Sequence, residues 1–135
     1  MSVLEVKGVS KSFDGEEIIR DISLNLQEGE IVSLLGVSGG GKTTLFNLIA
    51  GLTVPDEGNI YLQGEDVTGK PGNVSYMLQK DLLLPYRTIL DNVALPLTVR
   101  GMKKSEAREK AAGYFEEFGL DGSEMKYPSE VSGGM

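Results

Sequence analysis

The sequence contains no cysteine and no histidine. Without cysteine there is neither a disulfide framework nor a thiolate metal site. Without histidine, the commonest zinc ligand and the commonest general base are both missing. Any chemistry performed by these residues therefore uses carboxylates, amides, hydroxyls, lysine or the backbone.

Positive charge and long apolar runs are also scarce. Lys and Arg number 13 against 20 Asp and Glu, a formal net charge of −7, which argues against a nucleic-acid or anionic-membrane surface. The longest apolar stretches fall short of the roughly 20 residues that a membrane-spanning helix needs. The first residues lack the pattern of a secretory signal. We therefore expect a cytoplasmic location and no nucleic-acid partner.

The first part of the chain has the patterns of β-strands. Residues 3–13 and 18–26 alternate apolar and polar positions around the turn signal "DG", which predicts an antiparallel layer with one solvated face. The stretch "IVSLLG", residues 31–36, is apolar at nearly every position and is typical of a strand covered on both faces. Short strands are also predicted within residues 59–67 and over 72–79.

Helical patterns follow the glycine-rich stretch and dominate the last third of the sequence. A short helix is predicted from Lys42 to its end at Gly51. A second helix is expected to begin at Thr88. The clearest pattern runs over residues 105–119, with Ser105 as the expected N-cap.

Gly36, Gly41, Lys42 and Thr43 match the phosphate-binding pattern G-x-x-x-x-G-K-[ST] between a predicted strand and a predicted helix. Glycines let backbone N–H groups turn inward around phosphate oxygens, and the helix dipole adds to that field. In this pattern the lysine reaches the β- and γ-phosphates and the threonine hydroxyl holds Mg²⁺. The alternative is a flexible turn with a solvated lysine, but a plain turn does not need three consecutive glycines.

Such loops serve GTPases, kinases, helicases and transporter ATPases. The whole chain resembles the ATP-binding subunits of ABC transporters, in its N-terminal β pattern, in "GVSGGGKTT", in Gln79 after a predicted strand and in the closing "VSGG". The resemblance implies an α/β fold, a P-loop NTPase core with an N-terminal antiparallel β layer and the beginning of a helical subdomain. The expected division is residues 1–80 for an incomplete ATP-binding core and 81–135 for an incomplete helical subdomain.

The resemblance also implies roles for individual residues. Phe13 is expected to stack on adenine, with a strand-end core phenylalanine as the alternative. Gln79 is expected to contribute to Mg²⁺ and to the attacking water, and Thr43 to hold Mg²⁺. The expected ATP-binding residues are Phe13, Gly36, Val37, Ser38, Gly39, Gly40, Gly41, Lys42, Thr43 and Thr44.

"VSGG" resembles the family signature LSGGQ, with Val131 and Met135 as departures. The resemblance implies that Ser132, Gly133 and Gly134 face the γ-phosphate held by a second ATP-binding subunit. It further implies transmembrane permease subunits as partners, at the inner face of the cell membrane. Residues 82–97 are expected to dock these permeases, although Leu82 to Leu84 packing beneath the helices is left open. The sequence of this segment, together with the methionine after "SGG", most resembles those of importers of nitrate, sulfonate, taurine and related small anions.

Family members carry further catalytic groups downstream: an aspartate that backs Mg²⁺, a glutamate base and a switch histidine. Asp66 and Asp91 lack the strand-end context to replace them. We therefore expect this chain to bind ATP and Mg²⁺ but to hydrolyse ATP poorly alone, with a long apolar edge exposed where the missing strand would lie. The alternatives are a different small P-loop kinase or GTPase, or a non-catalytic truncated product or binding module.

Overall fold

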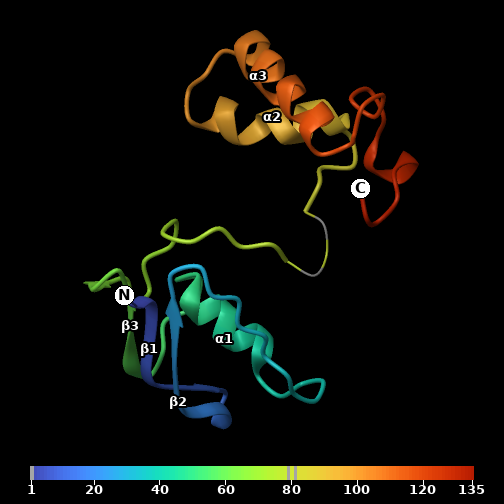
Figure 1. The fold of residues 1–135 in the computed structure, drawn as a ribbon. Helices are drawn as coiled ribbons and strands as arrows, with labels where there is room; N and C mark the ends of the chain where they lie inside the picture. The colour runs from blue at the N-terminus through green and yellow to red at the C-terminus, as the bar shows by residue number, and fades with distance from the viewer. Residues whose placement is uncertain (1, 79, 81) are drawn as a thin grey trace. The chain divides into compact units, whose positions relative to one another are not determined.

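The computed structural model describes residues 2–78, 80 and 82–135. It contains two compact units, Met1–Met77 and Leu78–Met135. In Figure 1 the first unit runs from blue to green and the second from yellow to red. Each unit has its own arrangement of elements and its own apolar core.

The first unit contains an antiparallel four-stranded sheet in the order β2-β1-β3-β4. Its strands are β1 (Ser2–Phe13), β2 (Glu16–Gln27), β3 (Glu57–Leu62) and β4 (Glu65–Asp66). β1 pairs with β2 along most of its length and with β3 on its other edge. The structure thus confirms the predicted N-terminal antiparallel layer.

Helix α1 (Lys42–Ile49) packs against this sheet and closes the first core. The helix contributes Leu45 and Leu48, which lie three positions apart and so share one face. It ends as predicted, because Gly51 adopts a φ of 72° just after the C-cap. The buried residues of this core are Leu4, Val6, Val9, Ile19, Leu45, Leu48, Ile60 and Val67.

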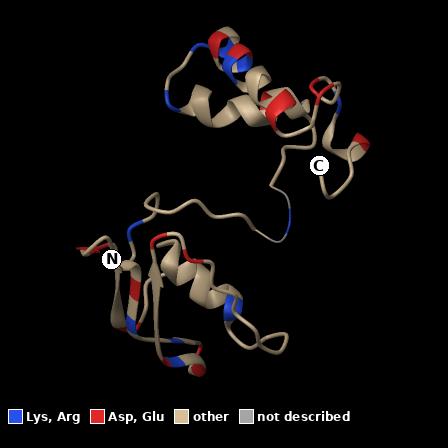
Figure 2. Ribbon diagram, viewed as in Figure 1, with Lys and Arg blue, Asp and Glu red and all other residues tan. Residues whose placement is uncertain are grey.

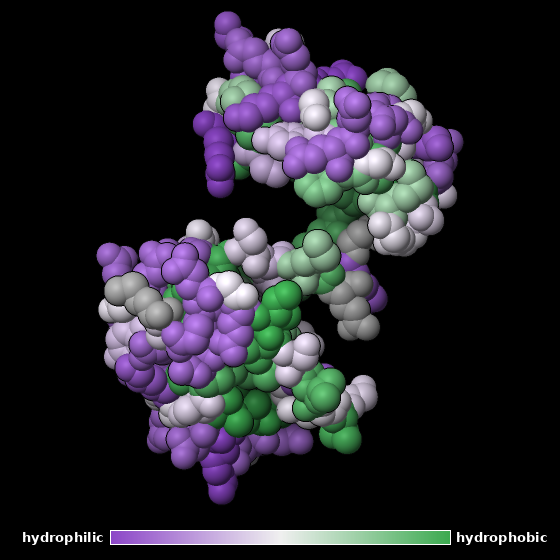
Figure 3. All heavy atoms as spheres, viewed as in Figure 1, coloured by the Kyte–Doolittle hydropathy of each residue, from purple (hydrophilic) through white to green (hydrophobic). Residues whose placement is uncertain are grey.

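The prediction of a buried strand at residues 31–36 is wrong. The segment forms no strand, and the Ile31 and Leu35 side chains are 93% and 95% exposed. An apolar run becomes a strand only when a neighbouring strand pairs with its N–H and C=O groups, and the described residues provide none beside it. Green apolar side chains accordingly reach the surface of this unit in Figure 3.

The strand predicted over residues 72–79 is also not observed in its described part, residues 72–78. The Tyr76 hydroxyl instead donates to Asn47 Oδ1 at 3.2 Å, and the Tyr76 ring stacks near Phe46 with 6.3 Å between centroids. Side-chain contacts with α1 therefore hold this segment in place of sheet hydrogen bonds.

The second unit consists of α2 (Ile89–Val99), α3 (Lys104–Glu117) and the short 3₁₀ helix η1 (Pro128–Glu130). Thr88 caps α2, since its hydroxyl oxygen accepts from Asp91 N at 3.2 Å. The buried residues of its core are Ile89, Leu90, Ala94, Ala107, Ala111 and Phe115.

Ser105 is not the N-cap of α3 as predicted. The N-cap lies two residues earlier, because the carbonyl of Lys103 already accepts from Ala107 N at 2.9 Å. Lys103 is therefore the N-cap, and Ser105 lies in the first turn.

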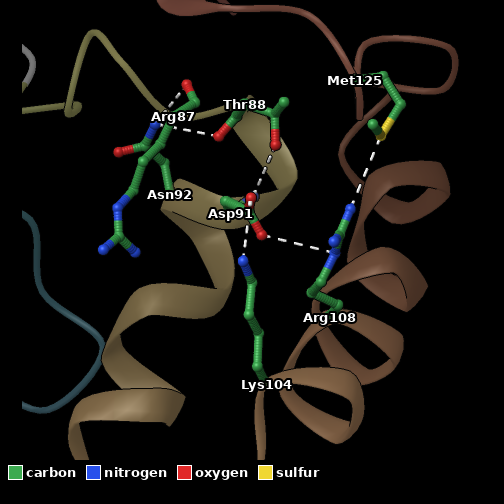
Figure 4. Close-up of polar contacts among 7 residues, drawn as sticks. All are labelled: Arg87, Thr88, Asp91, Asn92, Lys104, Arg108 and Met125. Carbon is green, nitrogen blue, oxygen red and sulfur yellow. Dashed lines mark hydrogen bonds and ion pairs between the residues drawn. The ribbon is translucent and has the colours of Figure 1, made fainter.

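Asp91 connects the two long helices of the second unit. From the first turn of α2 its carboxylate faces two cations on α3, Arg108 Nε at 3.5 Å and Lys104 Nζ at 3.8 Å (Figure 4). The Asp91 side chain is only 19% exposed and that of Arg108 35%, so this pair is screened less by solvent than a fully exposed pair, whereas Lys104 is 67% exposed. Both ion pairs complement the apolar contacts between α2 and α3.

Asn92 closes the loop that precedes α2. Its amide nitrogen donates to the carbonyls of Leu84, Arg87 and Thr88 at 3.1 to 3.2 Å. Its amide oxygen accepts from Leu84 N at 2.7 Å. One buried side chain thus makes four hydrogen bonds to the backbone around the start of α2, of which Figure 4 shows those to Arg87 and Thr88. Over the described ranges, every helix is too short or too polar to cross a bilayer.

Replacing Asn92 should destabilise the second unit. Asn92→Ala removes the side-chain partner of Leu84 N and of Arg87 O, whereas the carbonyls of Leu84 and Thr88 keep their backbone hydrogen bonds, and we expect a loss of about 2 kcal/mol in unfolding free energy. Urea denaturation followed by circular dichroism measures the loss. Asn73→Ala is the matched control, because Asn73 is exposed and its side chain makes one hydrogen bond, to Lys70 O. Equal effects of the two substitutions would contradict this role for Asn92.

Candidate functional site

The glycine loop joins α1 at Gly41, and only glycine fits this position. Gly41 has a φ of 83°, in the left-handed region. A Cβ atom there would lie 2.5 Å from Ile19 Cγ2 and 3.0 Å from Ile18 O, both on β2. The end of the loop is therefore pressed against the sheet, and the start of α1 is fixed with it.

The loop turns back on itself between Val37 and Gly40. Gly40 N donates to Val37 O at 3.1 Å, and a Cβ atom on Gly40 would approach the same oxygen to 3.0 Å. Gly39 has a φ of 80°, but a side chain there would meet only open space. The loop thus needs glycine for conformation at Gly39, and for both conformation and space at Gly41.

Lys42 extends back across the mouth of the loop. Its Nζ donates to Gly36 O at 2.7 Å and to Val37 O at 2.6 Å. The ammonium group thus lies where the loop begins although the residue itself starts α1. An anion that enters the loop can take over these hydrogen bonds with more favourable charge.

The first turn of α1 presents free backbone donors to the loop. No side chain among the described residues caps the helix, and its first turn has no acidic residue (Figure 2). The N–H groups of Lys42, Thr43 and Thr44 therefore lack intrahelical partners, and the helix dipole favours an anion in front of them. Thr43 is exposed in this turn, with a hydroxyl oxygen of the kind that Mg²⁺ accepts as a ligand.

Phe13 lies at the end of β1, opposite Glu16. Its side chain is 46% exposed, and it is not among the buried residues of the sheet core. Lys11 Nζ lies 5.3 Å from the centroid of the Phe13 ring. An exposed aromatic ring at a strand end suits stacking on a planar base.

The strand register relates Phe13 to the glycine loop. Lys11, two residues before Phe13, pairs with Ile19 of β2. Ile19 is the residue against which Gly41 packs. The end of β1 and the end of the loop thus adjoin the same part of β2.

Asp56 is a residue of this region that the sequence analysis missed. Its carboxylate accepts from Lys11 Nζ at 2.7 Å and from Ser12 N at 2.7 Å, while its own N–H donates to Ser10 O at 2.9 Å. The Lys11 hydrogen bond, followed by the Ser12 N–H, holds the pKa of Asp56 below its usual value. In the sequence, "PDEG" indicates only a turn, and no local pattern shows which strand that turn faces.

The structure does not test the expected role of Gln79, which lies outside the described residues. Ser132, Gly133 and Gly134 are exposed in the second unit. There Met135 N donates to Ser132 O at 3.0 Å, which makes a turn. Each of these assignments stays a prediction.

The leucines after Gln79 differ from one another. The Leu82 side chain is 73% exposed, as a docking surface requires. Leu83 instead packs against the core of the second unit, and Leu84 is held through its backbone by Asn92. The exposure of Leu82 thus fits the docking alternative, whereas the contacts of Leu83 fit the packing alternative.

Comparisons with known proteins show the family of this chain. The profile of the ABC transporter family matches residues 19–135. The uncharacterized ABC transporter ATP-binding protein YtlC of Bacillus subtilis is 41% identical over 100% of this chain and 54% of its own length. The formylaminopyrimidine import ATP-binding protein ThiZ of Halalkalibacterium halodurans is 48% identical over 87% of this chain and 45% of its own length.

Solved structures show the same relationship. An ATP-binding cassette solved as a dimer in a post-hydrolysis state with ADP and Pi has a TM-score of 0.80 and 30% identity, over 97% of this chain and 64% of that one. An ATP-binding cassette of an ABC transporter gives a TM-score of 0.85 at 25% identity, over 99% of this chain and 60% of that one. The chain thus spans about half the length of its curated relatives, and its fold is the α/β fold of these cassettes.

Two glycine substitutions should separate conformational strain from steric clash. Gly39→Ala places a side chain at positive φ in open space, and we expect a loss of about 1 to 2 kcal/mol. Gly41→Ala adds the clash with Ile19 and should cost about 3 kcal/mol or more. Urea denaturation measures both. A loss at Gly41 no larger than at Gly39 would show that the loop does not press on β2.

The contribution of Asp56 to stability should depend on pH. Because its folded-state pKa is lowered, the ionised carboxylate stabilises the fold fully above about pH 4. This contribution is lost as the pH falls through the lowered folded-state pKa. The difference in unfolding free energy between wild type and Asp56→Asn should therefore shrink on acidification. The same comparison in a Lys11→Met background should show a smaller pH dependence, and an unchanged one would argue against the Lys11 contact as the cause.

Proposed function

The chain belongs to the ABC transporter family, and from that premise we propose that it is the ATP-binding part of a subunit that couples ATP binding and hydrolysis to transport across a membrane. The observation that carries this proposal is Lys42, whose ammonium group lies in the mouth of a glycine loop in front of an uncapped helix. Such an arrangement is suited to a phosphate chain.

In this proposal the phosphates of ATP enter the loop formed by residues 36–41. Lys42 exchanges the carbonyls of Gly36 and Val37 for phosphate oxygens, and the first N–H groups of α1 donate to the same chain. Thr43 and Gln79 supply oxygen ligands for Mg²⁺, which neutralises phosphate charge when it is bound. Phe13 provides the exposed ring on which adenine stacks.

Hydrolysis and transport are proposals for the whole subunit. The chain spans about half of its curated relatives, and catalysis by this class of protein depends on positioning and charge stabilisation around the γ-phosphate. We propose that Ser132, Gly133 and Gly134 complete the site of a second ATP-binding subunit, and that this chain alone hydrolyses ATP slowly.

We place the subunit on the inner face of the cell membrane, with a transmembrane permease as its partner. Support comes from relatives named as import ATP-binding proteins and from the exposed Leu82 beside the predicted docking segment. The cargo we favour is a small anion of the nitrate, sulfonate or taurine kind. One relative is named for sulfate and thiosulfate, whereas others are named for spermidine and putrescine or for Fe(3+) ions. Transport assays with the complete subunit and its permease test this choice.

Removing the ammonium of Lys42 should weaken ATP binding strongly. We expect Lys42→Met to weaken ATP affinity at least tenfold, because a charge-assisted contact to the phosphates is lost. Titration calorimetry with ATP and Mg²⁺ on the chain measures this affinity.

Lys70→Met is the matched control for Lys42→Met. Lys70 also donates to a backbone carbonyl, that of Asp66 at 2.7 Å, but it lies after β4 and away from the glycine loop in sequence. Its removal should leave ATP affinity unchanged. An equal loss in both variants would mean that any surface lysine attracts the nucleotide, and the proposed site would be wrong.

A further inference from the structure

We propose that Lys11, held in place by Asp56, is a positioning residue for base recognition: it covers one face of the Phe13 ring and leaves the other face to a purine. This inference rests on the proposed function, since it gives the proposed adenine-stacking ring a cation that orients it. Lys11 does not touch the reacting phosphates and is not a catalytic residue.

Lys11 is held in place by Asp56, which is itself fixed to β1. Lys11 Nζ lies 2.7 Å from Asp56 Oδ1, and its side chain is only 15% exposed. Asp56 is in turn fixed to β1 by the N–H of Ser12 and the carbonyl of Ser10. The ammonium group is therefore anchored to the same strand that carries Phe13, and it cannot swing away without breaking a charge-assisted hydrogen bond.

This anchored cation restrains the Phe13 ring. The Lys11 Nζ to ring-centroid distance of 5.3 Å lies within the range of about 6 Å in which a cation is attracted to the negative face of an aromatic ring. The Phe13 side chain is 46% exposed, and because Lys11 Nζ lies over one face of the ring, we assign the opposite face to the base. A ring that is already oriented loses less conformational entropy when a base stacks on it.

The position of Lys11 connects the base to the phosphate site. Lys11 pairs with Ile19 in the ladder of β1 and β2, and Ile19 is the residue against which Gly41 packs. The strand that positions the ring and the loop that binds the phosphates thus contact the same segment of β2. A nucleotide that is held at both ends benefits from a fixed spacing between them.

The same strand carries a similar cluster that serves as a control. Lys7 Nζ lies 4.8 Å from the Tyr61 centroid and 2.6 Å from Glu5 Oε2. The Lys7 side chain is 61% exposed, compared with 15% for Lys11. Tyr61 sits within β3, whereas Phe13 ends its strand. Lys7 and Tyr61 thus reproduce the cation and the ring but not the strand-end position.

The test compares ATP with inorganic tripolyphosphate, which has the phosphates but no base. We measure both dissociation constants by calorimetry for wild type, Lys11→Met, Asp56→Asn, Lys11→Arg and Lys7→Met. In Lys11→Met the ratio of ATP affinity to tripolyphosphate affinity should fall about threefold, since one cation–π restraint is lost. Asp56→Asn, which releases the lysine, should lower the ratio in the same direction. Lys11→Arg, which keeps the cation, and Lys7→Met should retain the wild-type ratio.

The outcomes separate this inference from the proposed function. If wild type binds both ligands but Lys11→Met and Asp56→Asn weaken them equally, Lys11 acts through general charge or stability, and the inference is overturned. A higher ATP affinity in Lys11→Met would mean that the lysine covers the face that the base uses, which also overturns it. If wild type binds neither ligand, the proposed nucleotide site itself fails, and the inference fails with it.

Discussion

The contact between Gly41 and β2 holds the candidate site to the body of the first unit. A side chain at Gly41 would overlap Ile19, and Ile19 belongs to the same buried core as Leu45 and Leu48 of α1. The apolar contacts that fasten the helix to the sheet therefore also set the position of its first turn. Orphan N–H groups can bind an anion with little reorganisation only when they are held in this way.

The two ends of the glycine loop are held very differently. The end at Gly41 is packed against the sheet, whereas the preceding residues 31–36 form no strand and are exposed except for Leu34, which packs against the first core. Lys42 connects these two ends, because its ammonium group holds the start of the loop while the residue itself begins α1. A nucleotide that binds the ammonium group must first break its hydrogen bonds to Gly36 O and Val37 O, and this cost reduces the net binding free energy.

Local patterns in the sequence predicted the elements that local interactions build. The alternation around "DG" predicted the hairpin of β1 and β2, and the glycine-lysine motif predicted the start of α1. The prediction of a strand at residues 31–36 is wrong because a strand needs a second strand to pair with, and no pattern within the segment shows whether one is present. The prediction of Ser105 as the N-cap is wrong because the hydrogen bond from Ala107 N to Lys103 O places the N-cap two residues earlier.

In the site that we propose, the residues for the phosphates and the residues for the base differ in how far apart they lie in sequence. The loop and Lys42 are consecutive, so one short motif encodes the proposed phosphate site. The proposed base site relies on contacts of Phe13 with Lys11 and of Lys11 with Asp56, and the last two residues are 45 positions apart. Their contact forms only because β3 returns alongside β1. Substitutions in the turn before β3 can therefore change the base site while the motif stays intact, so the motif alone predicts a nucleotide but not which base it carries.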